Sequence, residues 1–168
     1  SLAIMVGGNK EAFQRCLPIL QVLGQSIVHM GPSGSGQMVK LMNQVLVSGT
    51  LNSVCEALLF GMKAGVDIDK ALEVVMGGAA GSWQLANLGP RIAIGDFNPG
   101  FMVRLQQKDL RLILDTAGEL GLPLPGTSLV HQLYRSLEST GDQDLGTQAL
   151  FKVHQRLAGM PSAEPPSG

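Results

Sequence analysis

The sequence predicts a mainly α-helical protein that begins with a strand–helix–strand unit, and three observations predict it. Two short apolar runs, residues 2–6 and 26–30, are closed by glycines and enclose a stretch with helical spacing. From residue 37 onward the apolar residues recur at helical spacing. The 168 residues are 45% hydrophobic and 15% charged, which is enough apolar material for the core of about one domain.

The two apolar runs form the expected strands of the first unit. Between them, Asn9 caps an expected helix over residues 10–23, in which Pro18 should cause a kink or a break. Two strands cannot bury both faces of a sheet by themselves. Residues 1–31 are therefore expected to be the end of a larger sheet domain, so that the sequence is a piece of a longer protein.

A long helix is expected over residues 37–64, with Gly65 at its end and a length of about 40 Å at about 1.5 Å per residue. It is apolar on nearly every side, because Lys40 and Glu56 are the only charged residues between positions 37 and 62. Such a helix belongs inside a protein. Asn52 and Glu56 interrupt its apolar stretch, so we expect a core helix and not a membrane span.

The rest of the chain reads as shorter helices. Asp67 and Ser82 can each cap one of them, Pro90 can begin a further turn, and residues 96–100 have the composition of a loop. Further helices are expected at residues 105–120, 127–137 and 145–157, and a disordered, proline-rich tail at residues 161–168.

Composition excludes several classes of function. A formal net charge of −1 and 4% aromatic residues give no basis for binding nucleic acid or an anionic membrane. The scattered histidines have no metal-ligand spacing, so no metal site is expected. Cys16 and Cys55 are expected to be buried free thiols, and without a secretory signal in these residues the cytoplasm or an organelle matrix is the expected location.

The most informative feature is the glycine-rich stretch of residues 31–44, which leads into the long helix. It is not a phosphate-binding loop, because Gln37 and Met38 stand where that loop needs Lys followed by Ser or Thr. It is not a dinucleotide fingerprint either, because Val39 replaces the third glycine.

Asn43 and Gln44 follow Lys40 by three and four residues, which is about one helical turn, so both lie on the same face of the helix as Lys40. A lysine held in apolar surroundings can exchange a proton near neutral pH, and a neighbouring amide can orient a hydroxyl or carboxylate substrate. The alternative is that Lys40 only extends its ammonium group to water.

Two other groups carry possible chemistry. Trp83 follows a glycine-rich turn and is either a ligand contact or an anchor in a core or interface. Lys108 and Asp109 begin a helix after a loop that contains Phe101, and they are either a site or a solvated helix start.

Four stretches, residues 2–8, 34–44, 77–83 and 107–110, carry a family resemblance over residues 1–158. The sequence resembles the β-hydroxyacid dehydrogenases, which include 3-hydroxyisobutyrate dehydrogenase, tartronate semialdehyde reductase and the glyoxylate/succinic semialdehyde reductases. The resemblance implies that residues 1–31 end a Rossmann domain that binds NAD or NADP. Residues 32–160 would be a long bridging helix and an all-helical substrate and dimerisation domain. Because the glycine-rich nucleotide fingerprint is absent, this chain alone should be inactive.

The resemblance also implies roles for single residues. Lys40 matches the catalytic lysine, Asn43 matches a substrate-positioning asparagine, and some members place that asparagine where this chain has Gln44. Trp83 matches an aromatic position against the substrate. The nicotinamide end of the cofactor would be covered by Phe101, Lys108 and Asp109.

The implied reaction interconverts a short 3-hydroxy acid and its semialdehyde, in a homo-oligomer of the cytoplasm or the mitochondrial matrix. One alternative is a non-enzymatic oligomerisation scaffold of the same fold, although such a scaffold would not need Lys40. Another is a related dehydrogenase that acts on sugar acids or amines.

Overall fold

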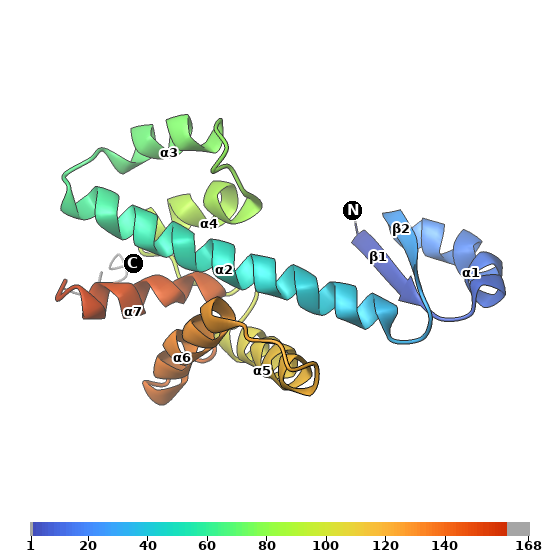
Figure 1. The fold of residues 1–168 in the computed structure, drawn as a ribbon. Helices are drawn as coiled ribbons and strands as arrows, with labels where there is room; N and C mark the ends of the chain where they lie inside the picture. The colour runs from blue at the N-terminus through green and yellow to red at the C-terminus, as the bar shows by residue number, and fades with distance from the viewer. Residues whose placement is uncertain (1, 161–168) are drawn as a thin grey trace. The chain divides into compact units, whose positions relative to one another are not determined.

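The computed structural model describes residues 2–160, and the predicted tail at residues 161–168 lies outside this range. By internal contacts the chain divides into two compact units, Ser1–Gln44 and Val45–Gly168. The elements follow in the order β1 (Leu2–Gly7), α1 (Lys10–Leu23), β2 (Gly24–Gly31), α2 (Ser35–Lys63), α3 (Ile68–Met76), α4 (Trp83–Ala93), α5 (Val103–Glu119), α6 (Pro125–Ser139), the 3-10 turn η1 (Thr147–Ala149) and α7 (Leu150–Leu157) (Figure 1). The prediction of a mainly helical protein is confirmed.

The first unit contains the strand–helix–strand arrangement that the sequence predicts. Strands β1 and β2 are parallel and adjacent, with Ala3 opposite Ser26 and Val6 opposite His29, and α1 connects them. No residue of α1 is buried, and Val22 is 84% exposed. The unit therefore leaves one side of this helix uncovered, as expected of two strands that cannot enclose a core.

Two expectations about α1 need correction. Of the kink or break expected at Pro18, the break does not occur, because proline removes one hydrogen bond of the ladder while the rest of the helix, capped by Asn9 Oδ1 on the Ala12 amide at 2.9 Å, is kept. Cys16 is exposed and not buried, because nothing in the unit covers that side of α1. Cys55 on α2 is buried as expected, and burial raises the pKa of its thiol.

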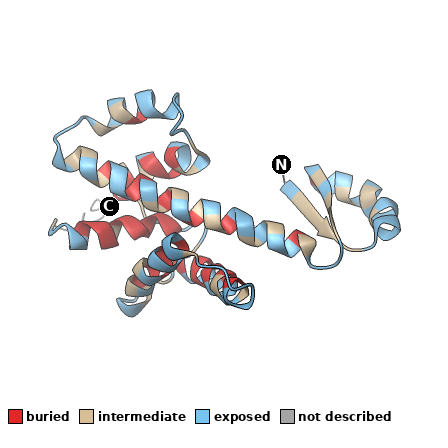
Figure 2. Ribbon diagram, in the orientation of Figure 1, coloured by how far each residue is buried: buried red, intermediate tan, exposed pale blue. Residues whose placement is uncertain are grey.

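The second unit holds the hydrophobic core. Its helices pack in pairs, with α3 against α4, α5 against α6 and α6 against α7, while η1 contacts α4, α5 and α7. Figure 2 shows the buried positions concentrated in α4, α5, α6 and α7 and along one side of α2. The largest fully buried side chains include Tyr134, Phe151, Leu51, Ile92, Leu110, Leu137 and Leu150.

Two boundaries in the second unit differ from the sequence expectation. Pro90 does not begin a separate turn but lies inside α4, which runs to Ala93. The last helix begins at Leu150 and not at Leu145, because the Gly146 amide donates to the Phe97 carbonyl oxygen at 2.8 Å. That bond keeps the chain extended before η1.

The expectation that α2 lies inside the protein holds only for one of its faces. Gln44, Ser48, Leu51, Cys55 and Leu58 are buried at helical spacing. Apolar side chains on the other faces are exposed, namely Met38, Met42, Leu46 and Phe60. The composition shows that the helix is apolar, but its burial depends on which other segments of the chain cover it. In this structure, other segments cover only one face of α2.

Among the described helices, α2 alone is long and apolar enough to cross a membrane by length and composition. Of its most apolar window, 28% is buried. The core helix of a soluble protein passes the same test, so a single such helix is weak evidence for a membrane location.

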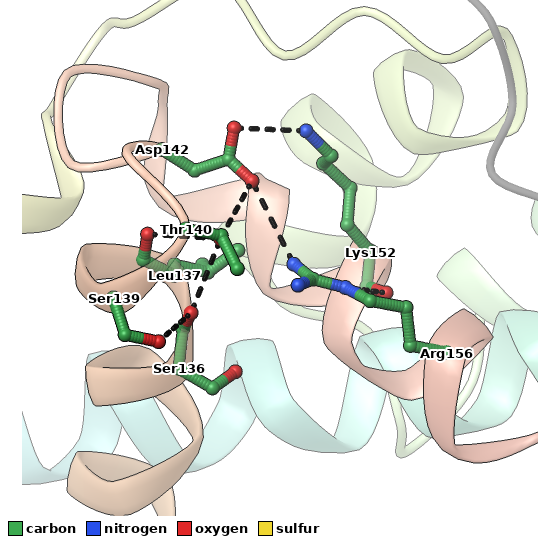
Figure 3. A network of polar contacts seen from close by, with 7 residues as sticks. All are labelled: Ser136, Leu137, Ser139, Thr140, Asp142, Lys152 and Arg156. Carbon is green, nitrogen blue, oxygen red and sulfur yellow. Dashed lines mark hydrogen bonds and ion pairs between the residues drawn. The ribbon is translucent and has the colours of Figure 1, made fainter.

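A polar network joins the end of α6 to α7 (Figure 3). Asp142 Oδ1 accepts from Lys152 Nζ at 3.0 Å, and its Oδ2 lies 3.6 Å from Arg156 and 3.3 Å from Thr140 Oγ1. The Asp142 amide also donates to the Leu137 carbonyl oxygen at 2.9 Å. One carboxylate therefore holds the end of one helix and two cations of the next.

We expect Asp142→Ala to lower the free energy of unfolding by about 1–2 kcal/mol, because it removes charge-assisted bonds that are only partly exposed. Denaturant unfolding measures this. The matched control is Asp144→Ala, since Asp144 makes a single ion pair with Arg104 and its side chain is 67% exposed. The control should change stability by less than about 0.5 kcal/mol, and equal losses in both variants would contradict the network's role.

Candidate active site

The glycine-rich loop starts α2 directly against β1, inside the first unit. Gly31 and Gly34 have φ angles of +121° and +92°, a region that favours glycine. A Cβ atom on Gly36 would collide with the Met5 carbonyl oxygen, and one on Gly7 would lie 2.8 Å from the Pro32 carbonyl oxygen. The glycines at positions 7 and 36 thus allow the close contact that fixes where α2 begins.

Lys40 lies just after this first turn, and the structure brings it together with both amides that the sequence singles out. Lys40 Nζ donates to Gln44 Oε1 at 3.3 Å, and Asn43 Nδ2 donates to the same oxygen at 3.0 Å. Gln44 is 4% exposed, whereas Lys40 and Asn43 are exposed. In this cluster, an exposed ammonium group and an exposed amide both donate to one oxygen of a buried side chain.

The expectation of a buried ammonium at Lys40 is therefore wrong for this chain, because the apolar residues around it on α2 are themselves uncovered. The side chain nevertheless bends toward Gln44 along the helix. Among residues 2–160 it takes part in no ion pair. A cation without a carboxylate partner is one whose charge can serve a ligand.

A cavity of about 340 Å³ lies at the start of the same helix. Its walls come from the end of β1 and from the loop into α2, and its lining residues are Met5, Val6, Gly7, Ser33, Gly34, Gly36 and Gln37. Gln37 precedes Lys40 by three residues, so the two side chains share a face of α2. The sequence alone does not predict this cavity, because only the fold brings Met5 beside the loop.

In the second unit, the loop that carries Phe101 is held by side chains. Arg91 Nε donates to Asp96 Oδ2 at 2.8 Å, and the Asn98 amide donates to Asp96 Oδ1 at 3.0 Å. The buried Gln148 donates through Nε2 to the carbonyl oxygens of Asp96 and Asn98 at 3.1 and 3.0 Å. The Thr147 amide donates to the Phe101 carbonyl oxygen at 2.9 Å. The composition of the sequence predicts the loop but not these hydrogen bonds that hold it.

Asp96 gives this loop a pH dependence. The hydrogen bond from Arg91, then that from the Asn98 amide, lowers the pKa of Asp96 from 3.8 to about 2. Because the pKa is lower in the folded protein, this stabilisation is present above about pH 3.8 and is lost as the pH falls toward 2. We expect the Asp96→Asn variant to lose less stability than the wild-type protein as the pH falls from about 4 to about 2. Unfolding midpoints measured across that range test this, and an unchanged pH slope would contradict it.

Lys108 and Asp109 lie in the second turn of α5 and form an ion pair, with Lys108 Nζ 3.0 Å from Asp109 Oδ1. The Lys108 side chain is 58% exposed and that of Asp109 is 12% exposed. The buried carboxylate thus anchors one side of a cation that reaches solvent. Such a pair can present a positive charge to a ligand.

The residue before this pair is part of a buried network between α5 and α6. Gln107 Nε2 donates to Glu138 Oε2 at 3.1 Å, so Gln107 Oε1 is the acceptor for His131 Nδ1 at 2.8 Å. His131 therefore carries its proton on Nδ1. Burial, and then the nearby Arg135 and Arg111, lower the pKa of His131. This network fixes the turn of α5 from which Lys108 extends.

Trp83 begins α4, where Ser82 Oγ accepts from the Leu85 amide at 3.1 Å as predicted. Its side chain is 67% exposed, so it is not an anchor in the core of the second unit. Phe101 is also exposed. The structure thus groups Lys40 with Asn43 and Gln44, groups Lys108 with Asp109, and records neither Trp83 nor Phe101 in either group. The described residues contain no cluster of three His, Cys, Asp or Glu that would hold a metal ion.

Two family models match the chain in sequence order. Residues 1–31 match the NAD binding domain of 6-phosphogluconate dehydrogenase. Residues 34–154 match the model described as NAD-binding of NADP-dependent 3-hydroxyisobutyrate dehydrogenase, which covers most of the chain. The chain belongs to the β-hydroxyacid dehydrogenase family. NAD or NADP is the cofactor of this family, because one model describes an NAD binding domain and the other the NAD-binding part of an NADP-dependent enzyme.

Individual members of the β-hydroxyacid dehydrogenase family and their relatives agree with this. An uncharacterised oxidoreductase of Bacillus subtilis is 42% identical over 91% of the chain and 53% of its own length. The 2-hydroxy-3-oxopropionate reductase of Escherichia coli is 39% identical over 94% of the chain and 54% of its own length. A solved structure of the 3-hydroxyisobutyrate dehydrogenase of Mycobacterium tuberculosis, determined with L-serine, is 26% identical and has a TM-score of 0.82. The match covers 92% of this chain and 55% of that one. The chain thus spans about half the length of the curated relatives that it matches.

Proposed function

We propose that this chain is the part of an NAD(P)-dependent oxidoreductase that supplies the proton in the interconversion of a short 3-hydroxy acid and its semialdehyde. The observation that carries the proposal is the Lys40 cluster. Its ammonium has no carboxylate partner among the described residues and is oriented by the amide of Gln44 at 3.3 Å. Family membership supports the same assignment.

Lys40 is the acid in the reductive direction. As the carbonyl carbon is reduced, negative charge develops on its oxygen, and a nearby ammonium both stabilises that charge and delivers a proton. In the oxidative direction the neutral amine takes the proton of the hydroxyl group. Asn43 lies beside Lys40 and can hold the substrate by a hydrogen bond.

The bound nicotinamide cofactor would supply or accept the hydride. Residues of this chain suit the nicotinamide end of the cofactor. The exposed Phe101 has a ring face, and the exposed Lys108, which is paired with Asp109, has a positive charge. A glycine-rich loop for the pyrophosphate is not found among residues 2–160. We infer that Phe101, Lys108 and Asp109 contact only the nicotinamide end, and that Trp83 lies against the substrate.

Two relatives support a proposal for the substrate class. One relative reduces 2-hydroxy-3-oxopropionate, and a solved relative was determined with L-serine. Both molecules are three-carbon acids with oxygen at carbon 3. We propose a short acid of this type as the substrate, and a homo-oligomer as the working form.

The test is an assay of the full-length protein against short 3-hydroxy acids and their semialdehydes, with NAD and NADP separately. We expect turnover of at least one such pair, and no turnover by residues 1–168 alone. Turnover by the isolated chain would contradict its partial active site. A full-length protein inactive with every pair would instead favour an oligomerisation scaffold.

A further inference from the structure

Asn43 and Gln44 are neighbouring amides on α2, but their surroundings differ. Asn43 is exposed, whereas Gln44 is 4% exposed on the face of the helix that continues into Ser48. We propose that Gln44 is a positioning residue that holds Lys40 and Asn43, and that Asn43 alone presents an amide to the substrate. This inference rests on the proposed function of Lys40.

The hydrogen bonds fix the orientation of the Gln44 amide. Its Oε1 accepts from Lys40 Nζ at 3.3 Å and from Asn43 Nδ2 at 3.0 Å, and a carbonyl oxygen has two lone pairs. The acceptor is therefore occupied by two donors of its own helix. The opposite orientation would turn an NH₂ group toward an ammonium, which is unfavourable. A substrate hydroxyl would have to displace one of these donors to use this oxygen.

The same contacts restrict the two side chains that face solvent. Lysine has a long and flexible side chain, and its three ammonium protons point in fixed relation to one another. A bond from one proton to a buried oxygen limits where the other two point. The bond from Asn43 Nδ2 to Gln44 Oε1 likewise uses the donor end of the Asn43 amide, and its acceptor, Oδ1, remains for a substrate hydroxyl. One buried oxygen thereby sets the geometry of both exposed groups.

The acceptor is also neutral, and this matters for proton transfer. A carboxylate at position 44 would form an ion pair with Lys40 and would hold its proton more tightly. A glutamine orients the ammonium group without adding a charge. The choice of residue at position 44 therefore affects both the geometry and the pH range of the reaction.

The experiment compares Gln44→Met and Gln44→Glu in the full-length protein, with Lys40→Ala as the reference for lost chemistry. Methionine fills a similar volume without an acceptor, and glutamate keeps the acceptor but adds charge. The matched control is Gln155→Met, which changes another buried glutamine, on α7, whose Oε1 has no partner among the described residues. Steady-state kcat and KM are measured against pH, and thermal unfolding reports folding.

We expect Gln44→Met to lower kcat by about 10- to 100-fold, because a small misplacement of a reacting group has that effect. KM should change less than about threefold. Gln44→Glu should recover most of the rate and move the alkaline limb of the reduction to higher pH, by about one unit. Gln155→Met should retain the wild-type profile. If Gln44→Met does not fold, the shift of the alkaline limb of the pH profile in Gln44→Glu tests the inference by itself.

Two results would overturn the inference. An unchanged kcat with a strongly raised KM in Gln44→Met would make Gln44 a substrate contact. A loss that Gln44→Glu neither recovers nor shifts in pH would make its role merely structural. Failure of the proposed function is distinct, since the wild-type protein would then be inactive or Lys40→Ala would retain its rate.

Discussion

Lys40→Ala in the full-length protein is expected to lower kcat by about 1,000-fold while KM changes only a few-fold. The reason is that the substrate would still bind, but no group would donate a proton to the developing alkoxide. Lys40→Arg should be nearly as slow, because a guanidinium keeps the charge but does not release its proton at neutral pH. Steady-state kinetics in the reductive direction measure both.

The matched control for Lys40 is Lys63→Ala, which removes an exposed lysine from the last turn of the same helix. It should leave kcat and KM unchanged. Turnover near the wild-type value in Lys40→Ala would contradict the assignment of Lys40 as the proton donor. Equal losses in both variants would show that charge on α2, and not position 40, is what matters.

Gly36→Ala is expected to lower the free energy of unfolding by about 2 kcal/mol or more and to reduce turnover as well. A Cβ at this position would collide with the Met5 carbonyl oxygen and would lie 3.0 Å from the Gly7 amide nitrogen. Both neighbours are backbone atoms that cannot rotate away. The first turn of α2 would have to move, and Lys40 lies about one turn further along.

Gly49→Ala is the matched control, because a Cβ on Gly49 meets nothing within 4 Å. In the middle of α2 it should raise stability by up to about 1 kcal/mol, since alanine favours helix. Thermal and denaturant unfolding of the two variants measure the contrast. A Gly36→Ala variant as stable and active as the control would contradict the close contact between α2 and β1.

Local signals in the sequence were sufficient to predict most elements of the fold. Caps at Asn9, Asp67 and Ser82 and the glycines after the strands marked boundaries within a few residues, because these side chains act on their own backbone. The break at Pro18 and the burial of Cys16 were wrong. Both depend on how much of a helix is covered or held by the rest of the chain, which local patterns do not specify.

For the candidate site, the sequence identified the residues but not all of their surroundings. Helical spacing predicted that Lys40, Asn43 and Gln44 share a face, and they meet at one oxygen. The support of the Phe101 loop by Gln148 joins positions far apart in the chain, and no periodicity reports such a contact. Residues that act through long-range hydrogen bonds therefore become visible only in the fold.

The most direct measurement of the central claim is chemical rescue of Lys40→Ala by small amines, followed as the initial rate of hydroxy-acid oxidation. Methylamine and ethylamine should restore part of the lost rate, with a dependence on amine basicity, because the free amine would accept the proton that Lys40 takes in the intact protein. Tetramethylammonium, which has a charge but no transferable proton, should restore nothing. Equal effects of all three compounds, or no rescue by either amine, would contradict proton transfer at position 40.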